Sequence, residues 1–525
     1  MCSNSARSLG HHSMTQRLGY RRRWLAWIFV IVVQSLAVAP LHAQNPSSVT
    51  GPLVTLIDTA PSGTFNQLEQ LSATANQASY NQLTANPNGA VYCDPLLKGP
   101  SAKCPSNVFA VFSNLRELVQ SANELLNNGG PTFYSLHTNN QGLGFALRWV
   151  SGNNLAAPGS VTTQFANAQL SSVAARIEAL RLGATGFVLG GFNVSQDGRP
   201  AVAFNTPVAA GGGASADGSD IGIASRWGGF LNGAYGYGYR QPSVLENAFA
   251  FDSKDATLGV DYRFTRRLVA GASVSYTNQR VDFDSERSVA GGGFRAHGYG
   301  LLFYGLYEWE GPYLSFSAGW QHSSVDETRL ITYPSFNLAV PSTDATASGS
   351  THTNALIASF SAGWPLAYRA ATAEPYLNIE YRDAKLAGFT ETSVNNSGTE
   401  AGSDGGFQFA YASQDFHIAD AALGLRLQYA FTPHFGVIIP YARAEYHRYF
   451  GANTYTVAAA YSPIAGSGNL FNLPTDPADT HYSAFGGGFS VVLPHGVQGF
   501  AQYQTTSGMQ FVTSRLISAG IRVEF

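Results

Sequence analysis

The sequence predicts an all-β transmembrane barrel of about twelve antiparallel strands, preceded by a small, mainly α-helical N-terminal region with a candidate pore helix. Three observations predict this fold. Charged residues are only 12% of the 525 residues, against roughly 25% in soluble domains. From about Arg226 to Phe525, apolar and polar residues alternate with a period of two, as in strands with one face toward lipid. Short and long connections also alternate between these strands.

Residues 1–43 have the features of a secretory signal peptide. Arg21 to Arg23 form a basic region, Trp24 to Val33 is an unbroken apolar run, and Ala43 ends a small-residue cleavage site before Gln44. The apolar run is about half of the roughly 20 residues that a transmembrane helix needs. We therefore expect an exported chain that begins at Gln44.

Two cysteines of the exported chain, Cys93 and Cys104, bracket a loop rich in proline and glycine. In an exported protein such a pair predicts a disulfide. Closing so short a loop stabilises a fold by about 3 kcal/mol in the chain-entropy model. Free thiols or a metal site are the alternatives, but no histidine or further cysteine stands at a metal-ligand spacing. We expect no metal and no cofactor.

Residues 44–163 are expected to be a short, α-rich passenger. Two stretches carry apolar residues at helical spacing: Leu68, Leu71, Ala75 and Ala78, then Phe112, Leu115, Val119, Ala122 and Leu126. The region has no internal repeat and no esterase, nucleophile-elbow or zinc-protease motif. We therefore do not expect an enzyme.

Residues 164–183 are the candidate pore helix. Leu170, Val173, Ile177 and Leu180 share one helical face, and Gly183 follows in the usual capping position. The other faces carry groups that suit a polar lumen: Ser171, Ser172, Arg176, Glu178 and Arg181. The alternative is an ordinary helix that packs on the two helices predicted within residues 44–163. Residues 184–225 are expected to be a glycine-rich linker.

The barrel is expected over residues 226–525. The clearest strands alternate over Leu258–Phe264, Leu268–Tyr276, Leu314–Gln321, Leu377–Arg382, Leu423–Phe431 and Ile517–Phe525, and weaker ones start near Arg226, His297, Asn354, Phe435, Tyr482 and Val497. An even count fits a closed antiparallel barrel. Closure is needed because an open edge would leave unpaired backbone groups in hydrocarbon.

The connections set the orientation. Short joins at Thr265–Arg267, Trp309–Pro312, Arg369–Glu374, Thr432–His434 and Pro494–Gly496 alternate with long loops at about Gln279–Arg295, His322–Thr353, Asp383–Asp415 and Phe450–Thr480. Outer-membrane barrels have short periplasmic turns and longer extracellular loops, so both ends of the barrel are expected in the periplasm. A soluble sandwich or propeller would not explain this alternation.

Charges of both signs fall on positions expected to face the lumen: Asp261, Arg263, Glu380, Arg382, Arg426, Arg443, Glu445, Arg522 and Glu524. One interpretation is a pore lining that contacts a polar solute. The other is a mutually neutralising network that fills the lumen. We favour the network, because nearly balanced charges do not select an ion.

Together these residues carry a family resemblance. Arg226–Phe230, Leu258–Phe264 and Leu423–Leu427, with the terminal Phe525, resemble the translocator barrel of autotransporters, the type V secretion proteins. The resemblance implies a barrel with a helix through its pore and a passenger moved to, or held at, the cell surface. Ile521, Val523 and Phe525 resemble the signal read by the barrel assembly machinery.

The sequence departs from that family in two respects. About 40 residues separate the candidate pore helix from the first strand, where the family has almost none. The helix also lacks the Asn-Asn pair at which some members cleave, since Asn167 is followed by Ala168. We therefore predict an uncleaved protein.

The expected function is an outer-membrane barrel that anchors, exports and displays its own short N-terminal passenger at the surface of a Gram-negative cell. The alternatives are a channel plugged by its N-terminal region, or a surface adhesin. The expected partners are outer-membrane lipid and the barrel assembly machinery, and the barrel is expected to be monomeric. A net charge of -3 gives no indication of a nucleic-acid partner.

Overall fold

The computed structural model describes residues 49–155, single positions and short strands between 165 and 195, and 226–523 except for 398–401, 435, 452–453, 468–470, 478, 493–496 and 509–514. Residues 46–525 form one compact unit. The predicted signal peptide, most of the predicted linker, Glu524 and Phe525 lie outside the described residues.

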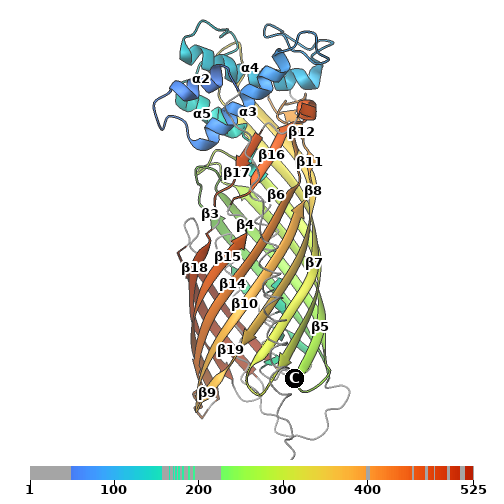
Figure 1. The fold of residues 1–525 in the computed structure, drawn as a ribbon, viewed down its shortest axis with the longest axis vertical. Helices are drawn as coiled ribbons and strands as arrows, with labels where there is room; N and C mark the ends of the chain where they lie inside the picture. The colour runs from blue at the N-terminus through green and yellow to red at the C-terminus, as the bar shows by residue number, and fades with distance from the viewer. Residues whose placement is uncertain are drawn as a thin grey trace, which may run out of the picture. The chain divides into compact units, whose positions relative to one another are not determined.

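One sheet carries the barrel strands, each antiparallel to the next along the chain (Figure 1). They are β3 (Trp227–Arg240), β4 (Phe249–Arg263), β5 (Leu268–Phe283), β6 (Gly291–Glu308), β7 (Tyr313–Tyr333), β8 (Thr343–Gly363), β10 (Ala371–Leu386), β14 (Gln414–Tyr429), β15 (Val437–Gly451), β18 (His481–Val492), β19 (Val497–Ser507) and β20 (Arg515–Val523). This confirms the predicted number of barrel strands.

The two ends of this sheet are joined differently from our expectation. Two short strands, β1 (Phe187–Leu189) and β2 (Asn193–Ser195), pair in parallel with β3, and β2 lies against β20. Among the described residues, β3 and β20 make no direct backbone pairing, so the expected closure by the first and last strands is not seen there. These short strands occupy a segment that the sequence indicated only as linker.

The outer face of the sheet is apolar. Its exposed side chains include Leu258, Val260, Val274, Leu301, Phe303, Phe316, Leu356, Phe360, Leu423, Leu425, Leu427 and Phe489. A soluble protein rarely exposes so large a contiguous apolar surface. Hydrocarbon solvates it, and the backbone groups of the strands are already paired with one another.

Aromatic rings mark both borders of this apolar band. Near the short turns, rings contact one another in the groups Trp227–Tyr262–Phe264, Tyr307–Trp309 and Tyr429–Phe431. At the other border, exposed rings include Tyr276, Tyr299, Trp320, Tyr381 and Tyr446. From Tyr307 to Tyr299 the strand rises roughly 27 Å at 3.4 Å per residue, or about 21 Å along a tilted barrel axis, near the roughly 25 Å of an outer-membrane band.

Several strands continue far above the band. Strands β7 and β8 have 21 residues each, whereas about 10 residues cross a membrane. The prediction of long loops at Gln279–Arg295 and His322–Thr353 was therefore wrong in large part, because most of these residues are strand. Above the band the outward side chains are polar too, as at Asp326 and Thr328, so the alternation on which we relied disappears.

The connections after β10 and β15 form a second, small sheet. It contains β11 (Phe389–Thr390), β13 (Phe409–Tyr411), β16 (Thr456–Tyr461) and β17 (Phe471–Pro474). Strand β12 (Thr392–Asn395) pairs with β8, β9 (Leu366–Tyr368) pairs with β10, and η5 (Ser462–Ser467) follows β16. Except for β9, which follows the strand predicted to start near Asn354, these segments were also predicted as loops.

The N-terminal region is helical: α2 (Pro52–Thr59), α3 (Gln67–Thr84), α4 (Ser106–Leu126), α5 (Asn140–Trp149) and the short η2 (Asn153–Leu155). Asn66 and Glu69 form a capping box at the start of α3, and Asn127 ends α4 in the left-handed conformation. The sequence predicted α3 and α4 but missed the shorter α2 and α5. No helix among the described residues combines the length and the hydropathy needed to span a membrane.

Candidate functional site

The lumen of the barrel contains residues of the candidate pore helix. The described positions from Phe165 to Arg181 are helical. Leu170, Val173, Ile177 and Leu180 are buried against inward-facing strand residues that include Leu302, Leu306 and Ile357. The apolar face seen in the sequence is thus packed against the barrel wall.

Polar contacts tie these helical residues to the wall at successive depths. The Gln321 amide on β7 donates to Gln169 at 2.7 Å. Farther along the chain, Arg176 meets Asp261 on β4, and Arg181 meets Glu374 at 3.2 Å on β10, close to a short turn. Because these contacts lie on well-separated strands, the segment is held from several sides of the lumen.

The Arg176–Asp261 ion pair is the most buried of these contacts. Nε of Arg176 donates to Oδ2 of Asp261 at 2.7 Å, and Nη2 donates to Oδ1 at 3.0 Å. The Tyr304 hydroxyl donates to the same carboxylate at 2.9 Å. Both charged side chains are at most 3% exposed, and a buried charge is tolerated only when it is paired and hydrogen-bonded.

A recurring unit positions these carboxylates. A tyrosine faces a glycine on the next strand, its ring fills the space where a Cβ would be, and its hydroxyl donates to a lumen carboxylate. The three examples are Tyr304 over Gly271 with Asp261, Tyr313 over Gly363 with Glu374, and Tyr376 over Gly424 with Glu445. Each carboxylate also pairs with an arginine, namely Arg176, Arg181 or Arg443.

A second network lines the wall formed by β14, β15 and β18. Nδ1 of His447 lies 3.1 Å from Oδ1 of Asp420, and its Nε2 lies 3.4 Å from Oε2 of Glu445. Arg443 lies 3.7 Å from Glu445, and the His447 ring stacks on Tyr482 at 4.6 Å. Acids and bases here neutralise one another within the wall.

The structure places the predicted lumen charges as follows. Asp261, Glu380, Arg426, Arg443 and Glu445 are buried, Glu380 pairs with the nearly buried Arg382, and Arg263 is half-buried. The Arg522 side chain and Glu524 lie outside the described residues. Glu374, Asp420, His447, Glu327, Arg329 and Glu391 were missed, although alternation in the membrane strands could have indicated an inward position for Glu374, Asp420 and His447.

Above the membrane band, a further buried pair joins the β7 extension to the small sheet. Nε and Nη2 of Arg329 donate to the two Glu391 oxygens, each at 2.7 Å, and Nη2 also donates to the Phe407 carbonyl at 2.8 Å. Glu391 in turn accepts from the Phe409 amide at 2.9 Å. This pair fixes the hairpin on which the helices rest.

The helices form a cap that shares its core with the strand extensions. We call α2 to α5 with their connections, residues 49–155, the helical cap. One apolar cluster joins Leu53, Leu118, Leu143 and Leu147 of the cap to Ile331 and Tyr333 of β7, Val340, Ala345 and Ala347. Another joins α3 and α4 to Phe409, Tyr411, Val457, Tyr461 and Phe471 of the small sheet. Figure 1 shows α3 and α4 beside this sheet, at the strand ends away from β9.

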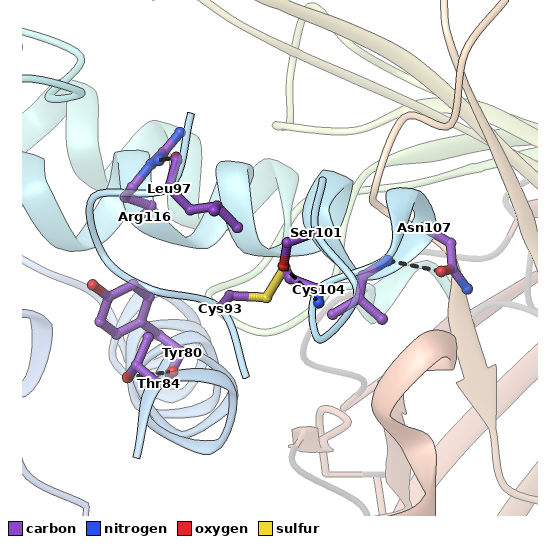
Figure 2. The surroundings of a disulfide bond; sticks show 9 residues. Tyr80, Thr84, Cys93, Leu97, Ser101, Cys104, Asn107 and Arg116 are labelled. Carbon is purple, nitrogen blue, oxygen red and sulfur yellow. Dashed lines mark hydrogen bonds between the residues drawn. A yellow bond between two sulfur atoms is a disulfide. The ribbon is translucent and has the colours of Figure 1, made fainter. Parts of the chain in front are cut away.

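The predicted disulfide is present and lies inside the second cluster (Figure 2). Cys93 and Cys104 have Cα atoms 5.1 Å apart. The Cys93 amide donates to the Leu83 carbonyl of α3 at 2.8 Å, and Cys104 stands two residues before α4. The bridge closes a short loop within the connection between α3 and α4 and fixes that connection to both helices.

Two neighbouring charged residues of α4 are buried in the cap. The Arg116 guanidinium lies 3.5 Å from the centre of the Tyr134 ring, and burial lowers its pKa. Burial raises the pKa of Glu117 to about 8, although Arg116 and the Ser113 hydroxyl favour its charged form. Glu117 is therefore mostly protonated at neutral pH.

The described residues contain no cluster of three or more histidine, cysteine, aspartate or glutamate side chains that could hold a metal ion. The arrangement is mechanical: described helical residues are tied to the wall of a polar lumen, and the cap packs on the extended hairpins.

Comparison with known proteins identifies one protein family. The family model for the autotransporter beta-domain matches residues 229–504. No curated protein sequence matches the chain. Among solved structures, the chain is similar to the beta domain of the Bordetella autotransporter BrkA, with 15% identity over 57% of this chain and 100% of that one and a TM-score of 0.36.

Two further structures are similar at the same level. The translocator domain of the autotransporter NalP from Neisseria meningitidis has 13% identity over 57% of this chain and 85% of its own, with a TM-score of 0.38. The transport unit of AIDA-I from Escherichia coli has 11% identity over 58% and 93%, with a TM-score of 0.33. The family assignment rests on the sequence match.

Replacing Asp261 by Asn should destabilise the folded barrel by about 3–5 kcal/mol, because the buried charge of Arg176 would lose the carboxylate that neutralises it. The double variant Arg176→Met, Asp261→Leu should recover most of that loss. Urea unfolding in detergent micelles measures both. Equal unfolding midpoints for Asp261→Asn and the native chain would show that the helical segment does not occupy the lumen.

The stability of the helical cap should fall as pH rises from about 4.5 to about 8. The folded cap keeps the Glu117 proton over this range, whereas the unfolded cap loses it near the ordinary pKa, so deprotonation favours unfolding until pH passes the folded value. Glu117→Gln should remove this dependence, and Asp58→Asn, at an exposed position of α2, should not. Limited proteolysis of the cap between pH 5 and 9 is the measurement. If the Glu117→Gln variant shows the same pH dependence as the native chain, Glu117 is not the group that causes it.

Proposed function

The chain belongs to the autotransporter family, and we propose that residues 44–163 are its passenger, which the barrel exports and then holds as a cap at the cell surface. The chain is an outer-membrane translocator barrel of the Gram-negative type that exports an N-terminal passenger. What the proposal adds is the identity of the passenger and its final position.

The carrying observation is that the cap packs on the hairpins opposite the short turns. Short turns lie on the periplasmic side of outer-membrane barrels and long connections lie outside. The cap contacts Ile331, Tyr333 and Val340 at the tip of the β7–β8 hairpin, which supports an extracellular position. Two shared apolar cores support a passenger that stays docked.

Residues 164–183 then serve as the pore helix that tethers the cap. The contacts from Gln169, Arg176 and Arg181 to the wall support this role. The segment connects the extracellular cap with the periplasmic end of the barrel, where β3 starts. Residues 184–225, which include the short strands β1 and β2, link this segment to β3, and residues 1–43 provide the signal peptide.

The remaining parts of the proposal follow from the same arrangement. The cap shares its apolar cores with the barrel, so we infer that the passenger is not released by cleavage. We also infer a monomeric barrel without enzymatic activity. Ile521, Val523 and Phe525 provide the signal for the barrel assembly machinery. The lumen charges serve to fill and neutralise the pore instead of selecting a solute.

Labelling of lysines on intact cells tests the position of the passenger. The chain has lysines only at Lys98 and Lys103 in the cap and Lys254 and Lys385 on the barrel strands, and all four are exposed. A membrane-impermeant amine reagent should label Lys98 and Lys103 without permeabilisation, on a full-length chain. Mass spectrometry of the labelled peptides identifies the sites.

Lys385 stands above the apolar band and serves as the internal control for surface exposure. A Lys98→Arg, Lys103→Arg variant should lose only the cap label. If the cap lysines react only after permeabilisation while Lys385 reacts on intact cells, the N-terminal region is a periplasmic plug. A labelled passenger released into the medium would contradict the uncleaved form.

A further inference from the structure

The outer faces of β5 and β6 change character step by step above the apolar band. Successive outward pairs of facing residues are Val274 with Leu301, Tyr276 with Tyr299, Asn278 with His297, and Arg280 with Arg295. The ladder thus goes from apolar to aromatic to polar to doubly cationic. All four side chains of the aromatic and arginine pairs are exposed.

Two arginines directly opposite each other are unfavourable, because like charges on facing strands repel. The other side of the barrel avoids this at the corresponding height. There, Asp383 faces His417 one step above the exposed Tyr381, with Oδ1 of Asp383 and Nδ1 of His417 3.1 Å apart. One step higher, Lys385 faces Asp415, with Nζ and Oδ1 3.9 Å apart. Between β5 and β6, the facing arginines therefore lack the cross-strand charge pairing that β10 and β14 show at this height.

Acidic groups lie beside the two guanidinium groups and not between them: Nε and Nη2 of Arg280 both donate to Asp282. Arg280 pairs with Asp282 of its own strand at 2.8 Å. The side chain of Arg295 makes no hydrogen bond or ion pair with any described residue. Asp252 faces Arg280 and Asp326 faces Arg295 on the outer sides of the row, so the acids flank the two cations.

A third cation extends the same surface. Lys254 on β4 faces Asn278, one step below the arginine pair, and its side chain is exposed. Along a tilted strand, the arginine pair lies roughly 10 Å above the aromatic pair at about 3.4 Å per residue. Long arginine and lysine side chains reach several ångströms along such a surface, which places their charges in the headgroup layer.

We propose that Arg280 and Arg295, with Lys254, bind the phosphorylated headgroup of an outer-leaflet lipid. A guanidinium donates two parallel hydrogen bonds to a phosphate, so a phosphate between the two arginines removes their repulsion. The exposed Tyr276 and Tyr299 lie below at the border of the hydrocarbon, and the acyl chains run down past Val274 and Leu301.

Binding of diphosphorylated lipid A to the folded full chain in dodecyl maltoside tests the proposal, with native mass spectrometry as the readout. The double variant Arg280→Gln, Arg295→Gln should bind about tenfold or more weakly, since each basic residue near an anionic lipid surface contributes. The matched control Lys385→Gln, Asp415→Asn changes the same number of exposed groups at the same height and should bind as the native chain does.

Two outcomes overturn the proposal. The first is equal affinity of the arginine variant and the native chain. The second is complete competition by equimolar inorganic phosphate, which would indicate a site for free phosphate and not for a lipid. Heat-dependent gel migration of each variant verifies that its barrel is folded, so a loss of binding is not a loss of fold.

Discussion

Backbone amide and carbonyl groups cannot remain unpaired in hydrocarbon, and the architecture of this chain follows from that requirement. Strands that pair with each other satisfy it, and their period of two then turns every second side chain toward lipid and the others inward. The inward side becomes polar, as at Asp261, Glu374 and Glu445. A polar, charged interior must in turn be neutralised and filled.

Residues of the helical segment and of the barrel wall together neutralise this charged interior. Arg176 and Arg181 bring positive charge to carboxylates that tyrosines already hold in place. A buried ion pair adds little net stability relative to apolar packing, but breaking it is costly, so these pairs fix the position of the segment. A segment fixed in the lumen leaves the preceding residues at the outer end, where the extended β7–β8 hairpin and the small sheet provide an apolar seat.

Much of the barrel could be predicted from the sequence because one physical pattern, alternation with lipid on one side, marks each membrane strand. The pattern ends where the lipid ends, so the extensions that carry Glu327 and Arg329 were interpreted as loops. Alternation also gives the face of a residue but not its height or its partner on another strand. It indicated that Asp261 points inward, but not that Arg176 is its partner. Asp420 and His447 also occupy inward positions of the pattern, but alternation gave no indication that they pair across strands.

Planar-bilayer conductance tests the central claim, a pore filled by a tethered helical segment, most directly. The chain from Gln44 onward should show little or no conductance, and the same chain without residues 164–183 should show large, stable conductance steps. Heat-dependent gel migration establishes that both barrels are folded. Equal conductance of the two chains would contradict the account, because the lumen would then be open, or closed by something else.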